Sequence, residues 1–125
     1  MSNLLLIALG GAVGSVARYG VVTLFFRPAA KGLFPWGTLV VNLLGCLLIG
    51  TLHGLLGDRI VRPEYRFLLV VGLLGGFTTF SSFGWETGTL LRDGHPSRAI
   101  AYVLASNVLG ILLVAAGWRL SVRPG

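Results

Sequence analysis

The residues best suited to chemistry lie close together, in a stretch that combines hydroxyls, aromatic rings and one carboxylate with many apolar residues. Phe80 and Phe83 are three residues apart, so a helix would place both rings on one face. Thr79, Ser82 and Glu86 would form a neighbouring polar stripe. Hydroxyl donors can replace water around a small anion, and the positive edge of an aromatic ring can face one. The stretch therefore predicts a site for a small anion, although each ring alone would be typical of an apolar core.

Two further segments carry polar groups at helical spacing. Thr38 and Asn42 fall on one face, and the Asn42 amide offers two donors and an acceptor. In the last apolar stretch, Tyr102 and Ser106 share a face, with Asn107 beside it. Polar side chains are costly to place among apolar ones, so each is a candidate for function. For Asn42, a hydrogen bond between helices is the alternative.

Other kinds of chemistry find little support. Glu86 is the only carboxylate within an apolar stretch, and the sequence contains no paired acids or Cys/His dyad there. His53 has no second His, Cys or carboxylate at metal-ligand spacing. The glycines at residues 10–14 lack the preceding strand that a dinucleotide fingerprint requires. We therefore expect that the protein is not an enzyme.

The composition indicates the elements that must position these groups. The 125 residues are 54% hydrophobic and 11% charged, with a mean hydropathy of +0.85, whereas soluble domains carry about 25% charged residues. Intrinsic disorder requires the opposite balance, and a single cysteine, Cys46, cannot form a disulfide scaffold. Because a membrane-spanning helix takes about 20 residues, the composition predicts an all-α membrane protein with four transmembrane helices.

Charged residues are confined to a few places, and the apolar runs between them predict four membrane spans. The expected spans are residues 4–26, 36–56, 67–91 and 99–118, which together form one transmembrane domain of residues 1–125. Pro35, Pro63 and Pro96 lie just before the last three spans, where the first helical turn tolerates proline. A secretory signal peptide is the alternative for the first span, but no basic residue precedes the apolar run.

Glycines four residues apart predict close helix packing. Gly10 and Gly14 form one such pair, and Gly50 and Gly54 form another. Small residues at this spacing let the backbones of membrane helices approach each other.

Glycines in the third span allow a second interpretation. Gly75 and Gly76 are adjacent and precede two threonines, and adjacent glycines weaken a helix. A break near residues 75–78 would free backbone carbonyls at the bilayer midplane, where they must be buried in protein or bind an ion. Close packing through Gly72 and Gly76 is the alternative. We favour the break.

The loop charges do not decide the orientation in the membrane. One side would hold five basic residues, Arg59, Arg62, Arg66, Arg119 and Arg123, and the other side four, Arg27, Lys31, Arg92 and Arg98. Orientation follows a bias in Lys and Arg, so either one loop fixes it weakly or the chain inserts both ways and pairs with an inverted copy. The net charge of +6 fits anchoring to lipid headgroups. The sequence contains no motif for nucleic-acid binding.

Three motifs follow one another along these spans: Gly10-Gly11-x-x-Gly14-x-x-x-Arg18-Tyr19, Gly37-Thr38-Leu39-x-Val41-Asn42-x-x-Gly45, and Gly75-Gly76-Phe77-Thr78-Thr79-Phe80-Ser81-Ser82-Phe83. With them the chain resembles the CrcB/Fluc family of fluoride ion channels over essentially its whole length. The third motif is the most specific. Ser82 and Gly84 stand where threonine and serine are common in the family, and Gly84 shortens the hydroxyl track by one group.

The resemblance implies a dual-topology antiparallel homodimer with two separate fluoride pores. It implies a structural sodium ion at the dimer interface, held by the backbone carbonyls of Gly75 and Thr78. It places Arg18 in a vestibule and implies that the pore is lined by residues of the second, third and fourth spans: Thr38, Asn42, Phe80, Ser81, Ser82, Phe83, Glu86, Tyr102 and Ser106. The implied location is the inner membrane of a bacterial cell.

Our hypothesis is passive fluoride efflux that protects a microbial cell. Hydrogen fluoride enters neutral and ionises inside, and the trapped anion then leaves down its gradient. The partners would be fluoride, the lipid bilayer and the inverted copy. A proton-coupled small multidrug or guanidinium exporter that uses Glu86 is the alternative, although such exporters carry their essential glutamate in the first helix. A subunit whose polar residues only join helices is a further alternative.

Overall fold

The computed structural model describes residues 2–26 and 33–124, and the regular structure within these ranges is entirely helical. Arg27 and Lys31, two of the loop charges considered above, lie outside the described residues. The elements in chain order are α1 (Asn3–Phe25), α2 (Trp36–Leu56), η1 (Gly57–Val61), α3 (Pro63–Tyr65), η2 (Arg66–Leu74), α4 (Gly75–Phe77), α5 (Phe80–Arg92), α6 (Pro96–Leu104), η3 (Ala105–Leu109) and α7 (Gly110–Ser121). Among them η1 is a 3-10 helix, and η2 and η3 are π-helical.

These elements join into four long apolar segments, as predicted for a protein with four membrane spans. Each segment is long and apolar enough to cross a bilayer: Asn3–Phe25, Trp36–Val61, Pro63–Arg92 and Pro96–Ser121. Pro63 and Pro96 occupy the start of their helices, because proline presets the helical φ and its missing N–H is not needed there. The third and fourth segments therefore begin before the apolar runs themselves.

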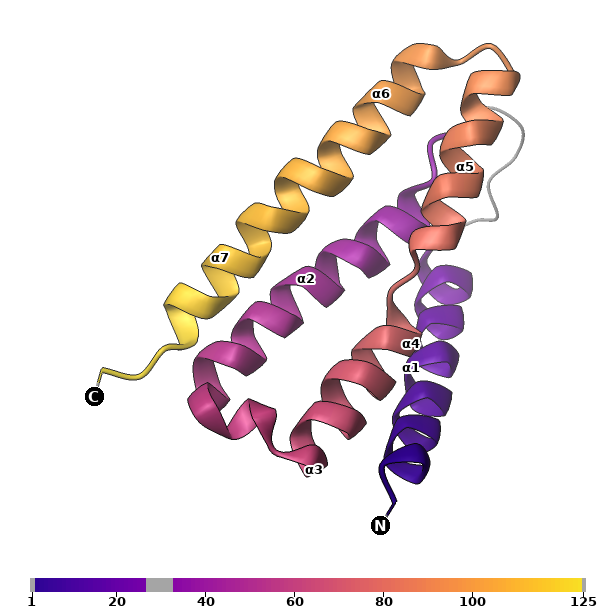
Figure 1. Cartoon of the computed structure of the whole chain (residues 1–125). Coiled ribbons are helices and arrows are strands. Elements are labelled where there is room, and N and C mark those ends of the chain that lie inside the picture. The colour runs from indigo at the N-terminus through magenta and orange to yellow at the C-terminus, as the bar shows by residue number, and fades with distance from the viewer. Residues whose placement is uncertain (1, 27–32, 125) are drawn as a thin grey trace.

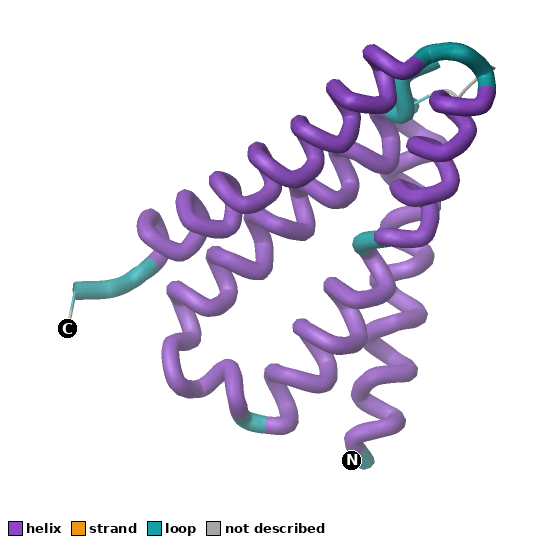
Figure 2. The backbone as a smooth tube through the Cα atoms, turned by 45° about the horizontal axis from the view of Figure 1, so that its top comes forward, coloured by secondary structure: helices purple, strands orange, loops and turns teal. Residues whose placement is uncertain are grey.

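The four segments form two pairs that diverge from each other. α1 lies along η2 and α4, and α2 lies along α7. The two pairs are close together where α5 meets α6 and spread apart toward the end that carries α3 and both chain termini (Figures 1 and 2). Few contacts join α2 to η2. The chain is therefore open between these two elements.

Glycines allow the close contacts within each pair. A Cβ on Gly10 would lie 3.0 Å from Gly72 Cα in η2, and a Cβ on Gly50 would lie 3.0 Å from the α7 backbone. Gly14 and Gly54 face neighbouring backbone at similarly short distances. Real side chains do not fit at such distances, so the predicted packing role of these four α1 and α2 glycines is confirmed.

The third segment is interrupted between α4 and α5. Thr78 and Thr79 are extended, with φ/ψ of −88°/158° and −148°/114°. Gly75 and Gly76 are still helical, and a Cβ on Gly76 would lie 2.6 Å from the Gly11 carbonyl oxygen of α1. The residues that leave the helix are thus the two threonines, whose β-branched side chains suit extended backbone.

Gly14→Ala is expected to destabilise the pair that α1 forms with the third segment. The added Cβ would lie 2.9 Å from the Phe77 amide nitrogen, and overpacking of this kind costs about 1–3 kcal/mol. Gly20→Ala is the matched control, because no atom of the described residues outside its own helical backbone lies within 4 Å of its Cβ position. The measurement is the free energy of unfolding in SDS-containing mixed micelles. Equal values for the two variants would contradict the packing role of Gly14.

Candidate functional site

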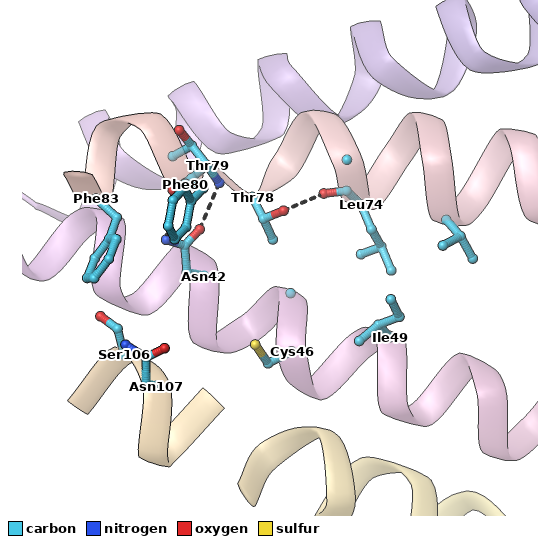
Figure 3. Close-up of a pocket in the computed structure, with 13 residues that line it drawn as sticks. Asn42, Cys46, Ile49, Leu74, Thr78, Thr79, Phe80, Phe83, Ser106 and Asn107 are labelled. Carbon is cyan, nitrogen blue, oxygen red and sulfur yellow. Dashed lines mark hydrogen bonds between the residues drawn. The ribbon is translucent and has the colours of Figure 1, made fainter. Parts of the chain in front are cut away.

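An open groove of about 430 Å³ lies between α2, the interrupted third segment and η3 (Figure 3). Residues from three of the four membrane segments line it: Asn42, Gly45, Cys46, Ile49, Val70, Leu74, Gly75, Thr78, Thr79, Phe80, Phe83, Ser106 and Asn107. Four residues predicted for the pore, Asn42, Phe80, Phe83 and Ser106, and the two predicted for the sodium site, Gly75 and Thr78, are therefore brought together here.

Asn42 on α2 pairs with the interrupted backbone. Its Oδ1 accepts a hydrogen bond from the Thr79 N–H at 2.8 Å, and its Nδ2 donates to the Thr79 carbonyl at 3.0 Å. Figure 3 shows Asn42 reaching across to Thr79 at one end of the groove. An extended residue between two helices cannot pair its N–H and C=O within either helix. Asn42 thus satisfies both backbone groups of one residue from a neighbouring helix.

The threonine side chains complete the interruption. Thr79 Oγ1 accepts a hydrogen bond from the Ser82 N–H at 3.2 Å and so caps α5. Thr78 Oγ1 donates to the Leu74 carbonyl at 2.9 Å. The hydroxyls of Ser81 and Ser82 lie 3.3 and 3.1 Å from Thr79 Oγ1. A group of three hydroxyls therefore extends from the interruption into the first turn of α5.

These bonds change the partners of two carbonyls. In a continuous helix, the Gly75 and Thr78 carbonyls would accept from the N–H groups four residues later, those of Thr79 and Ser82. Those N–H groups donate instead to Asn42 Oδ1 and Thr79 Oγ1. The two carbonyls are thereby released from helical pairing at residues that line the groove. Backbone oxygens in this position within a membrane require protein or an ion as a partner.

Three helices meet at the carboxylate of Glu86, outside the residues that line the groove. Thr38 Oγ1 from α2 donates to Oε1, and the Tyr102 hydroxyl from α6 donates to Oε2, each at 2.7 Å. Tyr102 is fully buried, and Thr38 is 8% exposed. Each carboxyl oxygen therefore accepts a hydrogen bond from one hydroxyl, at the usual O–H···O distance.

A row of aromatic rings joins the groove to the Glu86 site. The ring centroids of Phe80 and Phe83 are 5.6 Å apart, and those of Phe83 and Tyr102 are 5.1 Å apart. These ring pairs are tilted at 42° and 58°, which is a favourable arrangement for aromatic side chains. Phe80 is 82% exposed, whereas Phe83 packs against the core around Tyr102. The row therefore runs from an exposed ring to a buried one.

Of the predicted residues Ser106 and Arg18, the first lines the groove and the second does not. Ser106 Oγ is buried at the groove and has no hydrogen-bond partner within the described part of the chain. Arg18 is half-buried on α1 and does not line the groove. The structure therefore brings Ser106 to the predicted site but leaves Arg18 apart from it.

Thr79 and Phe34 have larger roles than the sequence indicates. The sequence indicates Thr79 only as part of a polar stripe, yet it is the partner of Asn42 and the cap of α5. Phe34 packs edge-on against Tyr102, with ring centroids 5.5 Å apart at 75°. The Thr-Thr pair after two glycines is a usable signal for Thr79. No local pattern connects Phe34 with a residue in the fourth segment.

The family model described as "CrcB-like protein, Camphor Resistance (CrcB)" matches residues 5–118. The chain belongs to the CrcB family. Three similar proteins, each named "Fluoride-specific ion channel FluC", come from Methylobacillus flagellatus, Thermus thermophilus and Phocaeicola vulgatus, and are 46%, 47% and 45% identical to this chain. The matches cover 96%, 96% and 94% of this chain and 94%, 95% and 96% of those proteins. The resemblance that the three motifs indicate is confirmed.

Asn42→Leu is expected to accelerate hydrogen exchange around Thr79. The substitution removes both hydrogen bonds to the Thr79 backbone, and a buried backbone group without a partner costs about 1–3 kcal/mol. Exchange is read by mass spectrometry on peptides that cover residues 75–85. Asn42→Asp is the matched variant, because its carboxylate still accepts from the Thr79 N–H but can no longer donate to the Thr79 carbonyl, so its exchange should lie between those of the wild type and Asn42→Leu. Unchanged exchange in Asn42→Leu would show that the interruption does not depend on this amide.

Tyr102→Phe and Thr38→Val are each expected to destabilise the protein by about 0.5–1.5 kcal/mol, the usual net contribution of a hydrogen bond. Each substitution removes one of the two donors to the Glu86 carboxylate. Thr23→Val is the control, since among the described residues the Thr23 hydroxyl bonds to carbonyls of its own helix, those of Tyr19 and Gly20. The free energy of unfolding in mixed micelles measures the effect. If both variants match Thr23→Val, the two hydroxyls do not hold the carboxylate.

Proposed function

We propose that this protein is a fluoride-selective ion channel that lets fluoride leave the cell passively and so confers fluoride resistance. The observation that carries the proposal is that relatives matching nearly the whole chain at 45–47% identity are named fluoride-specific ion channels. The site supports it, because Phe80, Phe83 and Asn42 lie in one groove. A channel also agrees with the expectation that the protein is not an enzyme.

Fluoride would bind in the groove between ring edges and neutral donors. Asn42 uses Oδ1 and one N–H for Thr79, which leaves its second N–H to donate to an anion. Phe80 is 82% exposed, so its positive ring edge is accessible to the ion. Phe83 and the Ser106 hydroxyl line the same groove.

From the groove, the ion would pass along the hydroxyls of α5 toward Glu86. Ser81 and Ser82 begin this path next to the interruption. At its end, the Thr38 and Tyr102 hydroxyls are occupied by the Glu86 carboxylate. An anion that arrives there competes with the Glu86 carboxyl group for these donors, because each hydroxyl has only one proton to donate. Arg18 would raise the local concentration of anions at a pore mouth.

We further propose that the channel is an antiparallel, dual-topology homodimer with two pores. The groove is open along one side of the chain, and a second copy would cover it and double the number of helices around the path. The near-equal numbers of basic residues in the loops on the two sides support insertion in both orientations. We place this multi-pass protein in the inner membrane of a bacterial cell.

Gly75 and Thr78 would hold a structural sodium ion at the dimer interface. Their carbonyls are released from helical pairing, and oxygen ligands suit a hard cation. A Cβ on Gly75 would meet only the Val70 carbonyl oxygen, at 3.7 Å, so its backbone is open to close approach. When bound, the ion would supply a positive centre between the interrupted helices of the two copies.

Fluoride efflux from proteoliposomes, read with a fluoride electrode, tests the channel. The wild type is expected to release fluoride, and Phe80→Ala and Asn42→Ala are expected to do so at least tenfold more slowly, because each loses a group that contacts the ion. Phe25→Ala makes the same change at another exposed phenylalanine, 75% exposed at the end of α1, and should conduct like the wild type.

Two outcomes would contradict these proposals in different ways. A wild type that releases no fluoride but exchanges guanidinium for protons would identify the alternative, an exporter that uses the intramembrane carboxylate of Glu86. A conducting wild type whose Phe80→Ala and Asn42→Ala variants conduct equally well would retain the channel but refute the site.

A further inference from the structure

Asn107 presents an amide on the outer face of the fourth membrane segment. It is exposed within η3, among the apolar side chains of Leu104, Val108 and Ile111, which are 57%, 51% and 70% exposed. A polar side chain that faces lipid at this depth is costly. Asn107 Nδ2 donates to the Val103 carbonyl one turn earlier, at 2.8 Å. This bond leaves the amide oxygen and a second N–H for another partner.

The position of Asn107 indicates the kind of partner. Asn107 lines the groove next to Ser106, whose buried hydroxyl has no partner within the described residues. Figure 3 shows the two side chains close together on the helix opposite the interrupted segment. A lipid chain in the groove would leave both polar groups unpaired, at a cost for each. A molecule that fills the groove must therefore carry hydrogen-bonding groups at this depth to pair with Ser106 and Asn107.

A second copy of this chain fulfils that requirement. Its own Asn107 has the same amide oxygen and second N–H available, so that each amide can donate to and accept from the other copy. Gly75, which has no Cβ, also permits close approach of another backbone. In an interface with two-fold symmetry, the same surface of each copy meets the other, so every contact occurs twice.

We propose that Asn107 forms a hydrogen bond to a second, inverted copy of this chain and thereby stabilises the dimer. The inference rests on the antiparallel dimer of the proposed function. It names a side chain that helps to determine how tightly the two copies associate. Asn107 is on this view a dimerisation residue and does not contact the permeating ion.

Asn107→Leu tests the inference, because leucine keeps the size of the side chain and removes the amide. A hydrogen bond between membrane helices changes an equilibrium about threefold, and two are lost per dimer, so the dimer dissociation constant should rise about tenfold. Single-molecule photobleaching of labelled protein in liposomes, at increasing dilution by lipid, measures this constant. Asn107→Gln keeps an amide and should stay within about threefold of the wild type. Leu24→Ala, at a 79% exposed position on α1 that does not line the groove, should match the wild type.

An unchanged dissociation constant for Asn107→Leu would overturn the inference. It would also be overturned by Asn107→Leu dimers of wild-type affinity that conduct fluoride more slowly, since the amide would then act on the ion. If Asn107→Leu does not purify as a monodisperse protein, Asn107→Ala is judged by the same criterion. The wild type tests the proposed function separately: a monomer at every dilution refutes the dimer, whereas a dimer without fluoride efflux refutes only the channel.

Discussion

One pair of hydrogen bonds, between the Asn42 amide and the Thr79 backbone, makes the interrupted third segment possible. A helix that stops inside an apolar segment leaves backbone groups unpaired, and such groups are costly away from water. Asn42 satisfies the N–H and the carbonyl of Thr79 at once. Since the Thr79 N–H is then no longer available to the Gly75 carbonyl, that oxygen is turned from a structural acceptor into one that can bind a partner. The stability of the interruption and its capacity to bind thus have the same origin.

The interruption also determines where α5 carries its polar side chains. Thr79 caps the helix, and the helix that starts there brings Glu86 to Thr38 and Tyr102. Because Asn42 and Thr38 are one turn apart on α2, a single helix holds both the start of α5 and its carboxylate. α2 is in turn held against α7 by Gly50 and other small residues. A short chain can therefore order these polar groups with few elements, while the groove stays open along one side.

Much of the fold could be predicted, because it follows from features within single segments. The glycine pairs predict close packing at Gly10 and Gly50, since spacing on one helix face is enough to identify a contact surface. The site was only partly predictable. The contact of Phe34 with Tyr102 joins two segments that share no pattern.

Hydropathy, helical spacing and motif composition are local properties of the sequence. The sequence alone is therefore enough to identify a four-span protein and the side chains that could bind a small anion. Which of these groups bond to one another depends on packing between segments. Asn42 and Thr79 are separated by 37 residues, and Thr38 and Glu86 by 48. A hydrogen bond requires atoms within about 3 Å and suitably directed, and no sequence pattern specifies that geometry across two helices. Only the tertiary structure therefore decided that the Asn42 amide supports the backbone and that the Glu86 carboxylate is held by two hydroxyls.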